Sequence, residues 1–87
     1  MKFKCGLSKT AIRNLVLWHS PIGLTKVPVR YCNLSRNKRW YSLDWDIFHV
    51  DVFAWDGDVH IVYYRGYEKF YECLADPDYL IDHKLCA

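Results

Sequence analysis

Residues 47–64, IFHVDVFAWDGDVHIVYY, are the part of the sequence that decides the fold. Asp56-Gly57-Asp58 separates two runs rich in β-branched and aromatic residues, and Asp-Gly between such runs is typical of a tight hairpin turn. We therefore predict a β-hairpin with strands 47–55 and 59–64. Alternation along these strands places an apolar set on one face, which we expect to face the core: Phe48, Val50, Val52, Ala54, Val59, Ile61 and Tyr63.

The opposite face of this hairpin has a mixed composition. Phe53, Trp55 and Tyr64 form a possible stacking face, because aromatic side chains on a sheet stack on bases in RNA-binding modules. His49 and His60, with Asp51, could instead carry out acid–base cleavage of RNA or hold a metal. In the structural alternative, Asp51 only orients a histidine, and a helix over 9–19 or 67–75 covers the aromatic rings.

Before the hairpin, the sequence predicts one helix and two strands. Ser8 is a suitable N-cap for a helix over 9–19, and Ser20-Pro21-Ile22-Gly23 ends it. Alternation over 24–32 predicts a strand, which Pro28 restricts to a sheet edge or to an interrupted strand. We expect residues 33–39 to be a polar, basic loop and residues 40–43 to be a short strand.

After the hairpin, Arg65-Gly66 is expected to end the strand. The spacing of Tyr67, Phe70, Tyr71 and Leu74 predicts a short amphipathic helix over 67–75. Asp76-Pro77 is typical of a second helix start, with Asp at the N-cap and Pro in the first turn. The fold class is therefore α+β: a small antiparallel sheet of about four strands, with an N-terminal helix and one or two C-terminal helices packed on it.

Length and composition indicate one globular domain over residues 1–87. The chain has 52% hydrophobic residues, and its 4 Trp, 7 Tyr and 4 Phe can supply a core in so short a chain. No apolar run approaches a membrane span, and the start of the chain lacks the pattern of a signal peptide, so we expect a cytoplasmic protein with no membrane partner. Four cysteines at long spacings predict free thiols, with no metal site and no cofactor.

Charge is divided between the two halves of the chain. Residues 1–40 contain nine Lys and Arg and no acid, whereas residues 41–87 contain ten acids and three bases; these charges, +9 and −7, give the net +2. The basic half could form a patch that attracts phosphates or an acidic protein. Alternatively, the two halves neutralise each other within one chain, or between subunits of a homo-oligomer.

The basic patch, with the aromatic residues that follow it, is the favoured binding site. Basic side chains would hold phosphates while neighbouring rings stack on bases. We expect these residues to bind nucleic acid or another partner: Lys9, Arg13, Lys26, Arg30, Arg36, Lys38, Arg39, Trp40 and Tyr41.

The sequence contains no glycine-rich phosphate loop and none of the common catalytic motifs, so we do not expect an enzyme. The favoured function is a non-enzymatic binding or regulatory protein, an inhibitor that docks on RNA or on a protein–nucleic acid complex through its basic N-terminal half. The first alternative is a protein–protein inhibitor of a host enzyme, toxin or defence complex that uses the aromatic and acidic surface; the second is a ribonuclease that uses His49 and His60. In style, though through no particular residues, the chain is similar to the small early proteins with which bacteriophages block host complexes.

Overall fold

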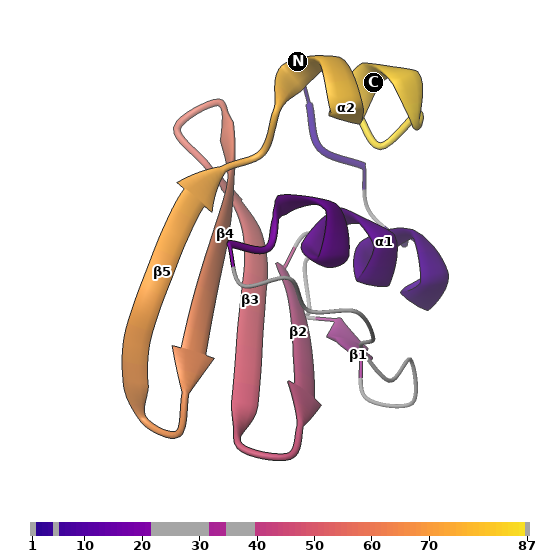
Figure 1. Cartoon of the computed structure of the whole chain (residues 1–87). Helices are drawn as coiled ribbons and strands as arrows, with labels where there is room; N and C mark the ends of the chain where they lie inside the picture. Colours follow the sequence, from indigo (N-terminus) through magenta and orange to yellow (C-terminus); the bar gives the residue numbers. More distant parts are fainter. Residues whose placement is uncertain (1, 5, 22–31, 35–39, 87) are drawn as a thin grey trace.

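The computed structural model describes residues 2–4, 6–21, 32–34 and 40–86, with 32–34 described by their backbone alone. The helices and strands in this part of the chain are α1 (Lys9–His19), β1 (Cys32–Leu34), β2 (Trp40–Trp45), β3 (Phe48–Trp55), β4 (Asp58–Arg65), β5 (Glu68–Leu74) and α2 (Pro77–Asp82). The strands form one antiparallel sheet in the order β1-β2-β3-β4-β5 (Figure 1). The α+β class predicted from the sequence is confirmed.

The central hairpin has the predicted turn. Trp55 pairs with Asp58, so Asp56 and Gly57 form a two-residue loop with φ values of 53° and 82°. A type I′ turn requires a positive φ at both central residues, and its twist matches that of the two strands it joins. Asp and Gly tolerate a positive φ better than most residues. The next loop also has two residues, since Arg65 pairs with Glu68, but only its first residue, Gly66, has a positive φ, of 65°.

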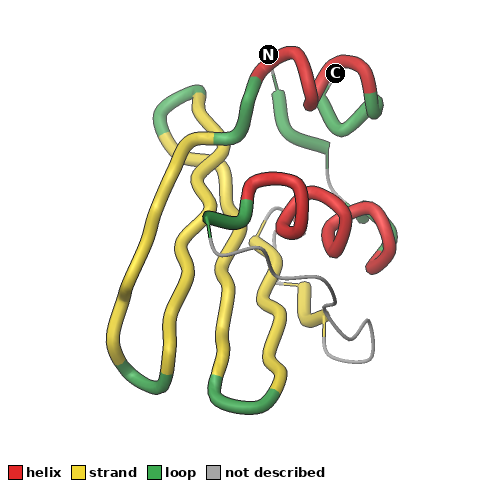
Figure 2. Tube along the Cα trace, in the orientation of Figure 1, coloured by secondary structure: helices red, strands yellow, loops and turns green. Residues whose placement is uncertain are grey.

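Both helices pack on one face of the sheet, as Figure 2 shows. The buried cluster joins Tyr41, Leu43, Val50, Val52, Val59, Ile61 and Tyr63 of the sheet to Ile12, Leu15 and Val16 of α1 and to Tyr79 and Leu80 of α2. Most of the predicted core face is thus confirmed. Phe48 is partly buried against this cluster, and Ala54, close to the hairpin turn, is exposed.

The predicted helix over 9–19 is confirmed. The Ser8 hydroxyl accepts a hydrogen bond from the Ala11 amide at 3.1 Å, which satisfies one of the free N–H groups of the first turn. At the other end, the Tyr63 hydroxyl donates to the Val16 carbonyl at 2.8 Å, and this bond joins the helix to β4. His19 lies within hydrogen-bond distance of the Leu15 carbonyl through Nδ1 and accepts from the Asp76 amide through Nε2.

The helix predicted over 67–75 is wrong, because these residues form the edge strand β5. Tyr67 and Leu74, which mark the ends of the helical spacing, are exposed and do not reach the core. The tight turn at Gly66 returns the chain beside β4. The backbone N–H and C=O groups on that side of β4 then form hydrogen bonds with β5. Aromatic residues are well suited to such a strand.

The two ends of the described chain meet beside α2. Asp76 caps this helix by accepting a hydrogen bond from the Asp78 amide at 3.0 Å, with Pro77 in the first turn as predicted. Phe3 pairs with Cys86 in an isolated antiparallel bridge. The strand predicted over 24–32 lies outside the described residues except for Cys32, the first residue of β1.

Candidate binding face of the sheet

The face of the sheet that points away from both helices, here called the outer face, is the candidate functional surface. Residues paired across antiparallel strands lie on the same face, so the register defines this surface. From β2 to β5 it carries Trp40, Ser42 and Asp44, then His49, Asp51, Phe53 and Trp55, then Asp58, His60, Val62 and Tyr64, then Lys69, Glu72 and Leu74. No described helix packs on this face, so the covering helix of the structural alternative is absent from the described residues.

Three rings form a row across the outer face. Trp40 of β2 stacks on Phe53 of β3 with centroids 4.7 Å apart, and Phe53 stacks on His60 of β4 at 5.3 Å. The ring planes differ by only 21° and 6°. These separations are close to the distance between neighbouring strands, so the rings overlap face to face and stand upright on the sheet.

This stacking decides what the row can offer a ligand. Both faces of Phe53 are occupied by its neighbours, so the row presents mainly ring edges to solvent. A base that stacks on an aromatic ring needs a free ring face. The interior of the row therefore lacks the flat platform expected for base stacking, and exposed Trp55 keeps its indole without a ring partner among the described residues.

A histidine held between two carboxylates lies beside the row. His49 Nδ1 contacts Asp44 Oδ1, and His49 Nε2 lies 2.7 Å from Asp51 Oδ1, which also accepts a hydrogen bond from the Ser42 hydroxyl at 2.8 Å. Partial burial lowers the pKa of His49, but the hydrogen bonds and charges of the two aspartates outweigh this effect and raise it above 6.5. Both ring nitrogens can donate to the aspartates only in the protonated form.

Next to this histidine the outer face is hollowed. The depression is lined by Asp44, His49, Asp51, Tyr64, Gly66 and Tyr67. Tyr67 follows Gly66 in the β4–β5 turn and is fully exposed. The depression therefore combines two carboxylates with two tyrosines.

The geometry separates the two histidines of the ribonuclease hypothesis. His49 is paired with Tyr64, whereas His60 is paired with Phe53, four residues further along β3. At about 3.3 Å per residue, the two positions are roughly 13 Å apart along the strand. An acid and a base that act on one phosphodiester must both come within hydrogen-bond distance of the reacting group. This pair does not have that arrangement.

The residues predicted to bind a partner are only partly brought together. Lys9 and Arg13 lie on α1, in the helical layer opposite the outer face. Phe53, Trp55 and Tyr64 share the outer face as predicted, and Trp40 joins them. The remaining basic residues lie outside the described part of the chain: Lys26, Arg30, Arg36, Lys38 and Arg39.

Tyr41 is a correction to the predicted site, because it is a core residue. Its pairing with Val52 turns it toward the helices, where it is 0% exposed. Its hydroxyl donates to the Lys4 carbonyl at 3.1 Å and accepts from the Leu7 amide at 3.0 Å. Tyr41 therefore anchors the N-terminal segment and cannot contact a partner.

Two contacts on the outer face are not predicted by the sequence. Asp44 was not connected with His49, and His60 was not placed in an aromatic row. Alternation along 40–45 does put Trp40, Ser42 and Asp44 on one side, but only the register of β2 against β3 shows which residues they meet.

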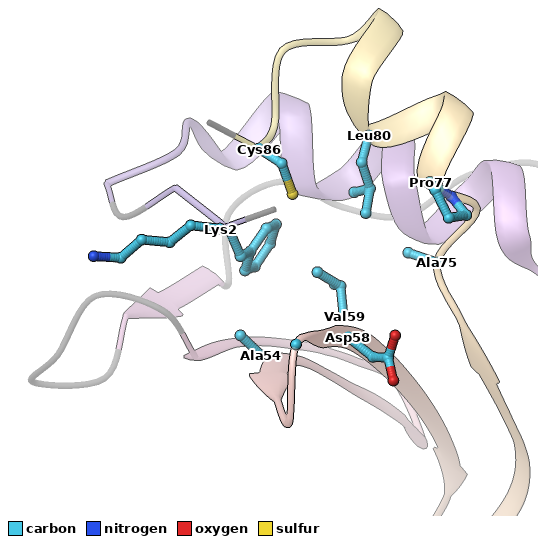
Figure 3. A pocket seen from close by; sticks show the side chains of 10 residues that line it. Lys2, Ala54, Asp58, Val59, Ala75, Pro77, Leu80 and Cys86 are labelled. Atoms are coloured by element: carbon cyan, nitrogen blue, oxygen red, sulfur yellow. The ribbon is translucent and has the colours of Figure 1, made fainter.

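A cavity of about 170 Å³ lies on the helical side, between the N-terminal segment, the β3–β4 turn and α2 (Figure 3). Phe3, Val59, Leu80 and Cys86 are among its lining residues. The ammonium group of Lys2 and the carboxylate of Asp58 point away from the space (Figure 3). A binding pocket normally offers a few convergent polar groups, so this cavity is a weaker candidate than the outer face.

Within the described residues, no group of three or more His, Cys, Asp or Glu is arranged to hold a metal ion. Cys73 and Cys86 are free thiols, and burial raises the pKa of each. No helix in this part of the chain is long and apolar enough to cross a membrane.

Comparison of the chain with protein-family models, with curated proteins and with solved structures finds no match.

Proposed function

We propose that this chain is a non-enzymatic binding protein that docks on a protein partner through the outer face of its sheet. The observation that carries the proposal is that aromatic side chains and carboxylates share this face, on which no described helix packs. Trp40, Phe53 and Trp55 supply apolar area, and Asp44, Asp51 and Asp58 lie on the same face.

The chemistry of this face favours a partner that bears cationic side chains. Arg and Lys can form charge-assisted hydrogen bonds with the carboxylates, and their apolar stems can lie against the ring edges. Trp55 is 70% exposed, and a large aromatic side chain of this kind is a typical hot-spot residue of protein interfaces. Phosphate groups would be repelled by the same carboxylates. A surface of this charge fits a protein that covers the basic site of its target, as an inhibitor does.

A pair of exposed tryptophans provides the test. Trp55 lies on the outer face, whereas Trp18 is 59% exposed on α1 in the opposite layer. The immobilised chain should capture a discrete protein from extracts of its native host, and nuclease treatment should not release it. Trp55→Ala should abolish capture, while the matched control Trp18→Ala should retain it. Capture that survives Trp55→Ala and fails with Trp18→Ala would contradict the proposal.

A second candidate function is docking on RNA or on a protein–nucleic acid complex. One observation favours it: Arg36, Lys38 and Arg39 directly precede Trp40, the first ring of the aromatic row. The chain itself therefore joins a basic run to one end of the row, where the outer face of the Trp40 indole has no described ring partner.

Salt dependence separates this candidate from the first. With a single-stranded RNA oligonucleotide, three to five phosphate contacts imply a log–log slope of affinity against salt of roughly −2 to −3.5. Reversal of Arg36, Lys38 and Arg39 to Glu should abolish RNA binding without unfolding the domain. Undiminished RNA binding by the triple variant, or an affinity independent of salt, would exclude docking through these residues.

A further inference from the structure

Among the described residues the sheet ends at β5, and this edge has unusual exposed chemistry. β5 is the last strand in the sheet order, and Figure 1 shows no element beyond it. An edge strand carries a row of unpaired N–H and C=O groups. Four large side chains of this strand and its turn are exposed as well: Tyr67, Phe70, Tyr71 and Leu74. Such an edge is well suited to pairing with another strand.

A bulge changes which side chains of β5 share a face. Tyr63 pairs with Tyr71 and Tyr64 with Lys69, so Phe70 is an extra residue in β5. In a regular strand, residues three apart point to opposite faces. With the extra residue, Lys69 and Glu72 both lie on the outer face, where their side chains form an ion pair at 3.1 Å.

The same bulge turns two aromatic residues toward the helical side of the sheet. Tyr71 is paired with Tyr63, and their ring centroids are 5.7 Å apart. The ring of Phe70 lies 6.2 Å from that of Tyr63 and 6.4 Å from that of Phe48, both core-side residues. Phe70 and Tyr71 are therefore neighbours on one side, and Lys69 and Glu72 are neighbours on the other.

We propose that β5 pairs with β5 of a second copy of this chain in an antiparallel register that sets Lys69 opposite Glu72 and Phe70 opposite Tyr71. A two-fold axis perpendicular to the sheet keeps the outer faces of both copies on the same side. In this register, outer-face residues meet outer-face residues and core-side residues meet core-side residues. A shift of one residue in either direction would set Lys69 opposite a core-side residue, so the bulge selects the register.

The charges of the strand are self-complementary in this arrangement. Each copy contributes one Lys69 and one Glu72, so the two-fold axis creates two identical cross-strand pairs of opposite charge. Opposite charges across antiparallel strands stabilise the pairing, and like charges destabilise it. The pairing joins the two sheets edge to edge and does not involve the outer faces, so it is independent of the proposed function.

Charge reversal at these two positions tests the proposal. Sedimentation velocity or light scattering over a range of protein concentrations should show a concentration-dependent dimer for the unmodified chain. Lys69→Glu and Glu72→Lys should each weaken the dimer by about tenfold or more, since each creates two like-charge pairs. The double variant Lys69→Glu/Glu72→Lys should restore it.

Mixing the two single variants provides a sharper measurement. Lys69→Glu has two acidic residues at these positions and Glu72→Lys has two basic ones, so the mixture should form a heterodimer although each variant alone is largely monomeric. Lys84→Glu, at an exposed position after α2, controls for the change in net charge and should dimerise as the unmodified chain does.

Circular dichroism at low concentration should confirm that every variant is folded. A chain that stays monomeric near millimolar concentration would overturn the proposal. A dimer that is insensitive to both single reversals, or single variants that fail to associate on mixing, would overturn it as well.

Discussion

The hydrogen bond between Tyr63 and Val16 links α1 directly to the sheet, and Tyr63→Phe removes it. The hydroxyl donates to the Val16 carbonyl at 2.8 Å in the core, and the tyrosine is 0% exposed. Val16 belongs to the last turn of α1, where the Ser20 amide donates to Leu17. Carbonyls in a last helical turn need partners from outside the helix ladder. Burial raises the pKa of the Tyr63 phenol, so the hydroxyl retains the proton that it donates.

The expected cost of Tyr63→Phe follows from this burial. The substitution preserves the ring and leaves a buried carbonyl without this donor, which costs about 1–3 kcal/mol. A domain of this length has a stability of roughly 4–13 kcal/mol, so the loss is a large fraction of the total. In thermal unfolding, each 1 kcal/mol corresponds to a shift of about 4–8 °C for a domain of this size.

Urea denaturation, with the slope compared between variants, measures this loss. Tyr64→Phe is the matched control, because Tyr64 is the next residue on the outer face and its hydroxyl makes no hydrogen bond within the described residues. The control should change the stability by less than about 0.5 kcal/mol. If both variants unfold at the same midpoint as the unmodified chain, the Tyr63 hydroxyl does not hold α1 in place.

Three further changes are expected to have measurable results. Asp76→Ala removes the cap of α2 and should lower the free energy of unfolding by about 0.5–2 kcal/mol in denaturant titrations; an unchanged midpoint would show that the cap contributes nothing. Because the pKa of His49 is raised above 6.5, its contribution to stability is full below that pH and is lost as the pH rises through the higher folded-state value. The difference in melting temperature between the unmodified chain and His49→Gln should therefore be larger near pH 6 than near pH 9, and an equal difference at both would contradict the two-carboxylate arrangement. Chelator and reductant should leave thermal unfolding unchanged, since no described residues form a metal-binding group and Cys73 and Cys86 are free; a large loss with either reagent would contradict this.

The candidate site was predictable only where it depends on local alternation. Phe53, Trp55 and Tyr64 share a face because alternate residues of a hairpin must do so, and the Asp56-Gly57 turn sets the register between their strands. Trp40 and Asp44 reach the same face through pairing with β3, but the same periodicity also buries Tyr41. Alternation separates the two sides of a strand, but it does not by itself show which side meets the helices.

The sequence by itself determined the elements that depend on neighbouring residues. The helix after Ser8, the Asp-Gly hairpin and the Asp76-Pro77 helix start each depend on caps or turns within a few residues, so local chemistry was sufficient. Only the tertiary structure decided the state of residues 68–74. Their apolar spacing suits a helix, but the open edge of β4 offers a complete row of hydrogen-bond partners, and that long-range pairing outweighs the local preference. The stacking of Trp40 on Phe53 and the contact of Asp44 with His49 were likewise beyond the sequence, because each joins strands whose alignment is set by burial of the opposite face.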